Sequence, residues 1–220
     1  MNIKALIFDF GGVITRTLFE THDLTERALG LPSGTLTWRG PFAPETDPVW
    51  QSMQEGEISE RDYWMRRTKE VGALVGKDWT GMSDFVKAAR GADPDAIIRP
   101  EFLETIDIAK RNGVRLAILS NELDLFYGKE LRSRLSFLAD FDVISDATYT
   151  EILKPDPRAY QDCLSKLKLE AQDCVFIDDQ KRNIEGAKAI GLSFVHFDVQ
   201  NPKAGFQAAL ELADIKEMQQ

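Results

Sequence analysis

Four groups of polar residues, spread along the chain, have the types and spacing to do chemistry together. In chain order they are Asp9, Ser120 with Asn121, Lys154, and Asp178 with Asp179. A carboxylate can attack an electrophile or bind a divalent cation, and a lysine supplies a fixed positive charge. Hydroxyl and amide groups donate hydrogen bonds to oxyanions. A site built from these residues would suit a small anionic ligand.

Three of these groups directly follow apolar runs that predict buried β-strands. The runs are rich in Ile, Leu and Val. They cover residues 5–8, 116–119 and 175–177, with weaker candidates at 143–145 and 194–197. Asp9, Ser120 and Asp178 are the first residues after the three strong runs. Ligands of an open parallel sheet bind beyond the carboxyl ends of its strands, so we expect these side chains at one edge of the sheet.

The remaining pattern predicts the fold class, which is α/β. From Pro100 onward, strand runs alternate with helix-period segments, which predicts a parallel sheet with helices on both faces. Residues 16–99 interrupt this alternation, because they contain all four tryptophans but no strand run, and four of the nine prolines lie between Pro32 and Pro48. We therefore predict a three-layer, Rossmann-like parallel sheet core of residues 1–15 and 100–220, with residues 16–99 inserted as a small helical cap domain.

Charge and hydropathy exclude several classes of partner. The chain has 27 Lys and Arg against 36 Asp and Glu, a formal net charge of −9 that no basic cluster offsets. We therefore expect it to bind neither nucleic acid nor a membrane surface. No apolar run approaches the roughly 20 residues of a membrane span, and the first segment lacks a signal-peptide pattern, so we predict a cytoplasmic location.

The two cysteines, Cys163 and Cys174, are too few for a disulfide framework or a zinc site. Free cysteine is among the most buried residue types, so we expect both thiols in the core. The sequence leaves the oligomeric state open between monomer and homodimer.

The order of these polar residues resembles the four motifs of the haloacid dehalogenase-like hydrolases, along nearly the whole chain. The matching residues are Asp9 with Gly11 and Gly12, Ser120 with Asn121, Lys154, and Asp178 with Asp179. The sequence looks most like the helical-cap branch that contains the phosphatase domain of soluble epoxide hydrolase and related sugar-phosphate phosphatases. This likeness implies no epoxide chemistry, which belongs to a separate α/β-hydrolase domain of the bifunctional enzyme.

The resemblance implies a Mg²⁺-dependent phosphatase that acts on a small phosphorylated metabolite. Asp9 would attack phosphorus to form an aspartyl-phosphate, and Lys154 would stabilise the charge of the transition state. The implied Mg²⁺ ligands are Asp9, the Gly11 carbonyl and Asp179. The implied phosphoryl-binding residues are Gly12, Ser120, Asn121 and Lys154. Asp178 and Asn183 would support the site, Asp178 by orienting a water on the metal or by holding Lys154.

Gly11 departs from the commonest pattern of the family, which has a second aspartate two positions after the nucleophile. That aspartate serves as general acid for the leaving oxygen, a contribution of about 10² to 10⁴ in rate. Without it, either the substrate has a good leaving group, as in sugar-1-phosphates and acyl phosphates, or the acid comes from elsewhere. His22, Asp23 and Glu20 are the candidates for such an acid.

Two other functions stay open for the same reason. One is a weakly active or inactive protein that binds phosphorylated ligands in a regulatory role. The less favoured one is a 2-haloacid dehalogenase, because those enzymes also lack the acid but typically carry an aromatic residue there and a different fourth motif. The physiological substrate would be selected by cap side chains, of which the candidates are Arg39, Trp50, Trp64, Arg66 and Arg67.

Overall fold

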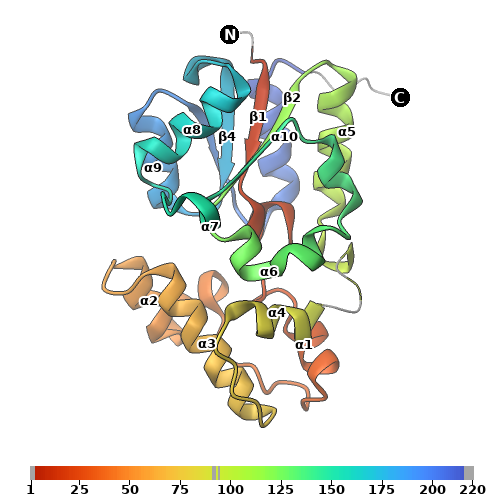
Figure 1. The fold of residues 1–220 in the computed structure, drawn as a ribbon, viewed down its shortest axis with the longest axis vertical. Coiled ribbons are helices and arrows are strands. Elements are labelled where there is room, and N and C mark those ends of the chain that lie inside the picture. The colour runs from red at the N-terminus through yellow and green to blue at the C-terminus, as the bar shows by residue number, and fades with distance from the viewer. Residues whose placement is uncertain (1–2, 91–92, 94, 216–220) are drawn as a thin grey trace. The chain divides into compact units, whose positions relative to one another are not determined.

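The computed structural model, which describes residues 3–90, 93 and 95–215, contains a five-stranded sheet in which every pair of neighbouring strands is parallel (Figure 1). The strand order is β3-β2-β1-β4-β5. The strands are β1 (Ala5–Phe8), β2 (Arg115–Ser120), β3 (Val143–Asp146), β4 (Cys174–Asp178) and β5 (Ser193–His196). Both the three strong strand predictions and the two weaker ones therefore correspond to strands of this sheet.

Register brings the ends of three strands to the same place. Phe8, the last residue of β1, pairs with Ile118 of β2 on one side and with Ile177 of β4 on the other. Asp9, Ser120 and Asp178 therefore lie at the carboxyl ends of three adjacent strands, as the sequence predicts.

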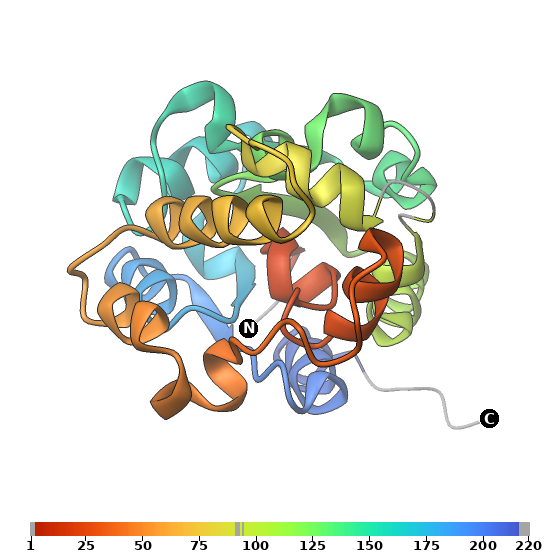
Figure 2. The ribbon, with the colours of Figure 1, turned by 90° about the horizontal axis from the view of Figure 1, so that it is seen from below.

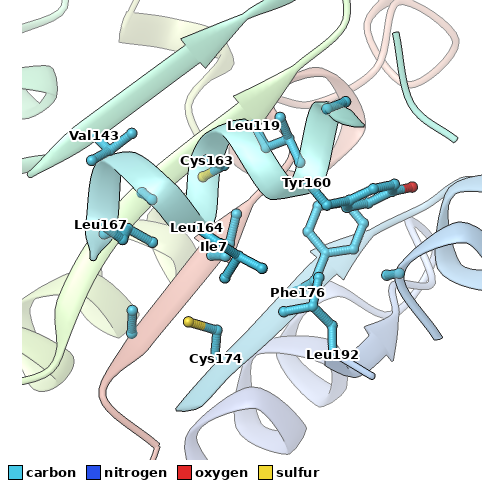
Figure 3. Packing of buried hydrophobic residues seen from close by; sticks show 14 of the residues in the cluster. Ile7, Leu119, Val143, Tyr160, Cys163, Leu164, Leu167, Cys174, Phe176 and Leu192 are labelled. Carbon is cyan, nitrogen blue, oxygen red and sulfur yellow. The ribbon is translucent and has the colours of Figure 1, made fainter. Parts of the chain in front are cut away.

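Helices cover both faces of the sheet, which confirms the predicted three-layer α/β class. The helices after the insert are α5 (Pro100–Arg111), α6 (Leu123–Arg132), α7 (Ala147–Thr150), α8 (Pro157–Leu167), α9 (Lys181–Ala189) and α10 (Pro202–Leu212). Successive side chains of a strand point to opposite faces. Phe8 contacts Phe102 of α5 and Phe206 of α10, whereas Ile7 joins the core cluster under α8 and α9 (Figure 3).

The core cluster under α8 and α9 contains both cysteines. Cys163 and Cys174 are buried in it with Ile7, Leu119 and Phe176 (Figure 3). Burial raises the pKa of both thiols to about 12, so neither forms a reactive thiolate near neutral pH. The prediction that these cysteines are core residues is confirmed.

Segments 17–97 and 125–134 form a separate unit, which we call the helical unit; the rest of the chain is the sheet unit. The α-helices within residues 17–97 are α1 (His22–Leu29), α2 (Pro48–Gln54), α3 (Glu60–Leu74) and α4 (Met82–Arg90), coloured red-orange to yellow in Figure 2. Residues 17–90, 93 and 95–97 contain no strand. The aromatic residues of the insert pack on one another, with Phe19 in contact with Trp38, Trp50 and Trp64.

The unit limits are close to the domain limits drawn from the sequence, with one larger difference. The first junction differs by one residue and the second by two, while residues 125–134, which the sequence assigns to the core, group with the helical unit. That residues 16–99 act as a cap stays a prediction. Every helix within residues 3–90, 93 and 95–215 is too short or too polar to cross a membrane.

Candidate active site

The chain turns sharply after β1, where Asp9 stands. The Asp9 N–H donates to the Ile177 carbonyl at 2.9 Å, which anchors the residue to β4. Residues Phe10–Ile14 then form a π-helical turn that is interrupted at its two glycines. Gly12 has φ 85°, a left-handed conformation that favours glycine, whereas Gly11 has φ −74°, which any residue adopts. We call residues 10–14 the nucleophile loop, because they follow Asp9, the nucleophile expected from the sequence.

The Lys154 ammonium lies between two carboxylates. Its Nζ donates to Asp9 Oδ1 and to Asp178 Oδ2, each at 2.7 Å, and its side chain is 1% exposed. Burial alone lowers the pKa of Lys154, but the negative charges of Asp178 and Asp9 outweigh it and hold the pKa above its usual value. Lys154 is therefore a charged lysine in direct contact with Asp9.

Asn121, the residue after β2, clamps the backbone of Lys154. Its Oδ1 accepts from the Lys154 N–H at 2.7 Å, and its Nδ2 donates to the Lys154 carbonyl at 3.2 Å. Ser120, the last residue of β2, is also buried. The structure brings both residues to the site, with both amide atoms of Asn121 bonded to Lys154.

Asp178 is fully buried and is held by three neighbours. Lys154 contacts its Oδ2, Asn183 Nδ2 lies 3.0 Å from each carboxylate oxygen, and the Gln180 N–H donates to Oδ1 at 2.8 Å. Asn183 lies on α9, and its backbone carbonyl accepts from the Tyr160 hydroxyl at 2.7 Å. Asp178 and Asn183 therefore contact each other directly, and their supporting role stays a prediction. Gln180 contacts Asp178 through its backbone N–H, so its residue type gave no signal for this contact in the sequence.

The carboxylates at this edge of the sheet suit a divalent cation. Oxygen atoms of Asp9, Asp178 and Asp179 all lie within 4.8 Å of one another. Carboxylate and carbonyl oxygens are the ligands that Mg²⁺ and Ca²⁺ prefer. The three carboxylates therefore fit such a cation, while the ligand set of Asp9, Asp179 and the Gly11 carbonyl stays a prediction from the sequence.

Two of the five candidate substrate-selecting residues are core residues of the helical unit. Arg67 Nη2 pairs with the buried Asp47 at 2.6 Å and its guanidinium lies over Trp38. Trp50 is also buried, against Phe19. Arg39 and Arg66 are exposed, and Trp64 is partly buried.

The three candidate general acids belong to the helical unit, and each of their side chains contacts a neighbouring residue of that unit. Glu20 accepts hydrogen bonds from the N–H and hydroxyl of Thr17 at 2.7 and 2.9 Å, and Asp23 pairs with Arg27. His22 is buried, with its ring 4.3 Å from that of Trp38. Burial lowers the pKa of His22 to about 4, assisted by the charge of Arg39. The imidazole is therefore neutral near pH 7.

This buried imidazole should make stability depend on pH. The unfolded chain binds a proton at His22 with a pKa near 6.5, but the folded chain does so only near pH 4, so the unfolded state binds more protons between these values. We expect the free energy of unfolding to fall by about 2 kcal/mol between about pH 7 and about pH 5 through this group. Urea unfolding of wild type and His22→Gln at both pH values measures the effect, and an equal pH dependence in the two proteins would contradict it.

Comparison with known proteins finds a matching family model, similar sequences and similar solved structures. A family model described as haloacid dehalogenase-like hydrolase matches residues 3–191. Phosphatase MT3486 of Mycobacterium tuberculosis (strain CDC 1551 / Oshkosh) is 30% identical over 196 residues, which cover 87% of this chain and 86% of that protein. A crystal structure of β-phosphoglucomutase from Clostridium difficile has a TM-score of 0.56 at 19% identity, over 96% of this chain and 97% of that one.

Two longer mouse proteins also match. Acyl-CoA dehydrogenase family member 10 is 26% identical over 89% of this chain, and Bifunctional epoxide hydrolase 2 is 22% identical over 87%. This chain spans 18% of the length of the first and 36% of the length of the second.

Proposed function

Because the chain belongs to the haloacid dehalogenase-like hydrolases, and is therefore a hydrolase, we propose that it cleaves small phosphomonoesters in a Mg²⁺-dependent reaction through an aspartyl-phosphate on Asp9. The observation that carries this proposal is the position of Lys154, whose ammonium lies 2.7 Å from Asp9 and 2.7 Å from Asp178. A carboxylate beside a buried cation, at the edge of a parallel sheet, is suited to receive a phosphoryl group.

The residues of the site divide the reaction into two steps. In the first, an Asp9 oxygen forms a bond to phosphorus while the bond to the leaving oxygen breaks. In the second, water attacks phosphorus while the bond between phosphorus and the Asp9 oxygen breaks, which releases inorganic phosphate and returns Asp9 to its carboxylate form. Lys154 orients the Asp9 carboxylate and stabilises the negative charge of the phosphoryl oxygens, with the Ser120 hydroxyl as a further donor. Asn121 contributes by fixing the Lys154 backbone.

The divalent cation expected here is Mg²⁺, held by Asp9, Asp179 and the Gly11 carbonyl. When bound, it supplies positive charge that reduces the repulsion between the Asp9 carboxylate and an anionic substrate. Because the chain carries a net charge of −9, it repels an anionic substrate, and the positive charge of the cation would offset this repulsion.

Metal removal tests the proposal. Purified protein should hydrolyse p-nitrophenyl phosphate with Mg²⁺ present, lose nearly all activity in excess EDTA, and recover it when Mg²⁺ is restored. Activity that resists EDTA would contradict the metal assignment. Absence of phosphatase activity, with tight binding of phosphorylated compounds, would favour the regulatory alternative, and halide release from 2-chloropropionate would favour the dehalogenase alternative.

Gly11 leads us to propose a preference for substrates with good leaving groups, such as sugar-1-phosphates. If no other group supplies a proton, kcat/KM should depend steeply on the pKa of the leaving alcohol, because the oxygen departs unprotonated. Aryl and anomeric phosphates should react well and simple alkyl phosphates poorly. A flat dependence, with the chemical step limiting, would instead mean that a proton donor is present.

The conformation of Gly11 allows the missing acid to be restored. Its φ of −74° accommodates a side chain, and a Cβ built there meets no described atom within 4 Å. Gly11→Asp should therefore raise kcat/KM for alkyl phosphates by about 10²-fold while changing aryl phosphates little. Gly11→Asn is the matched control, since it has nearly the same shape but no acidic proton. Equal rates for the two variants would contradict the leaving-group explanation.

The proposed partner is a small phosphorylated metabolite. A cytoplasmic location and a monomeric or homodimeric state remain predictions from the sequence.

A further inference from the structure

Arg99 lies where the chain re-enters the sheet unit, and its side chain reaches the nucleophile loop. It is 2% exposed. Its Nε and Nη2 both donate to the Gly12 carbonyl, at 3.1 and 3.0 Å, and its backbone N–H donates to the Ile14 carbonyl at 3.0 Å. Arg99 therefore contacts the nucleophile loop through both its backbone and its side chain.

The surroundings of Arg99 restrict its own movement. It directly precedes Pro100, the first residue of α5, and its guanidinium lies over the ring of Phe197 at 5.8 Å. The preceding residue, Ile98, forms an antiparallel bridge with Thr15. A planar guanidinium with two N–H groups on one acceptor fixes the direction of that acceptor as well as its distance.

The peptide that Arg99 holds begins at a glycine in a left-handed conformation. Gly12 has φ 85° and ψ −30°, and glycine loses more conformational freedom on folding than any other residue. A trans peptide carries its carbonyl and its N–H on opposite sides, so fixing the Gly12 carbonyl also sets the direction of the Val13 N–H.

We propose that Arg99 is a positioning residue, which holds the nucleophile loop in the conformation that receives the phosphoryl group. This inference rests on the proposed function of that loop. Arg99 acts on the site through Gly12, whose carbonyl accepts from its Nε and Nη2. Its removal should therefore weaken the interactions of the transition state more than the binding of substrate.

Arg99→Met and Arg99→Lys test this role, with Arg115→Met as the control. The Arg115 guanidinium also donates to a backbone carbonyl of the sheet unit, that of Leu167 at 2.6 Å, but not to the nucleophile loop. Arg99→Met should lower kcat for p-nitrophenyl phosphate about 10- to 100-fold and weaken inhibition by orthovanadate similarly, while KM changes much less. Arg99→Lys should retain part of the activity, and Arg115→Met should keep wild-type kcat and vanadate affinity.

Amide hydrogen exchange, measured by NMR, gives a second result that does not depend on turnover. In Arg99→Met, the amides of residues 11–13 should exchange faster and shift more than those of the strands. A folded Arg99→Met protein with wild-type kcat, vanadate inhibition and loop amides would overturn the inference and leave the proposed function intact. If the wild type hydrolyses no phosphomonoester, the proposed function fails, and unchanged loop amides would then overturn the positioning role as well.

Discussion

Replacing Asp9 by asparagine should lower kcat for p-nitrophenyl phosphate by about 10⁴-fold or more, because an amide neither attacks phosphorus effectively nor binds a hard cation well. The fold should survive, since Lys154 keeps its contact with Asp178 at 2.7 Å. Steady-state kinetics of the purified variant, with circular dichroism to verify folding, provide the measurement.

Asp140→Asn is a suitable control for this variant. Asp140 is a partly exposed aspartate of the sheet unit that pairs with Lys110, and its neutralisation should leave kcat unchanged. Wild-type turnover by Asp9→Asn would refute the covalent route, whatever the metal dependence.

The second large effect is expected for Lys154→Met, which should impair both activity and stability. Removing the ammonium deletes the donor to Asp9 and the positive charge at the phosphoryl site, so kcat should fall about 10² to 10³-fold. It also leaves the buried Asp178 without a counter-ion, and the free energy of unfolding should fall by about 3 kcal/mol. Urea unfolding and kinetics on the same preparation measure the two losses.

A double variant separates these two losses. Lys154→Met with Asp178→Asn removes the uncompensated buried charge, so it should recover part of the stability but none of the activity. Lys166→Met is the control, because Lys166 pairs with Asp162 at 2.6 Å in a partly exposed position of α8, where such pairs contribute at most about 1 kcal/mol. An active Lys154→Met protein would show that the ammonium has only a structural role.

The sequence alone predicts which strands end at the site, because each strand is marked by a short run of neighbouring apolar residues. Asp9, Ser120 and Asp178 each stand at the end of a short apolar run, and parallel strands place their carboxyl ends at one edge of a sheet. Even the weaker runs at 143–145 and 194–197 correspond to strands, β3 and β5. The place of Lys154 in the site is predicted from the order of the motifs, which resembles that of the family.

The details of the site depend on contacts between distant parts of the chain. Asn121 bonds to a residue 33 positions away and Arg99 to one 87 positions away, and no local pattern marks either pairing. The burial of His22 against Trp38 and the grouping of residues 125–134 with the helical unit are likewise tertiary effects. Such features require the packed structure.

The central claim is that a phosphoryl group is transferred to Asp9, and acid-quench trapping tests it most directly. Wild-type protein is mixed with substrate and Mg²⁺, quenched in acid within milliseconds and digested for mass spectrometry. Borohydride treatment of a parallel sample converts an acyl phosphate to homoserine. We predict that the peptide containing Asp9 gains the mass of one phosphoryl group and yields homoserine at position 9. The trapping is done under conditions in which hydrolysis of the intermediate is slower than its formation. An unmodified Asp9 peptide during active turnover would then contradict the account.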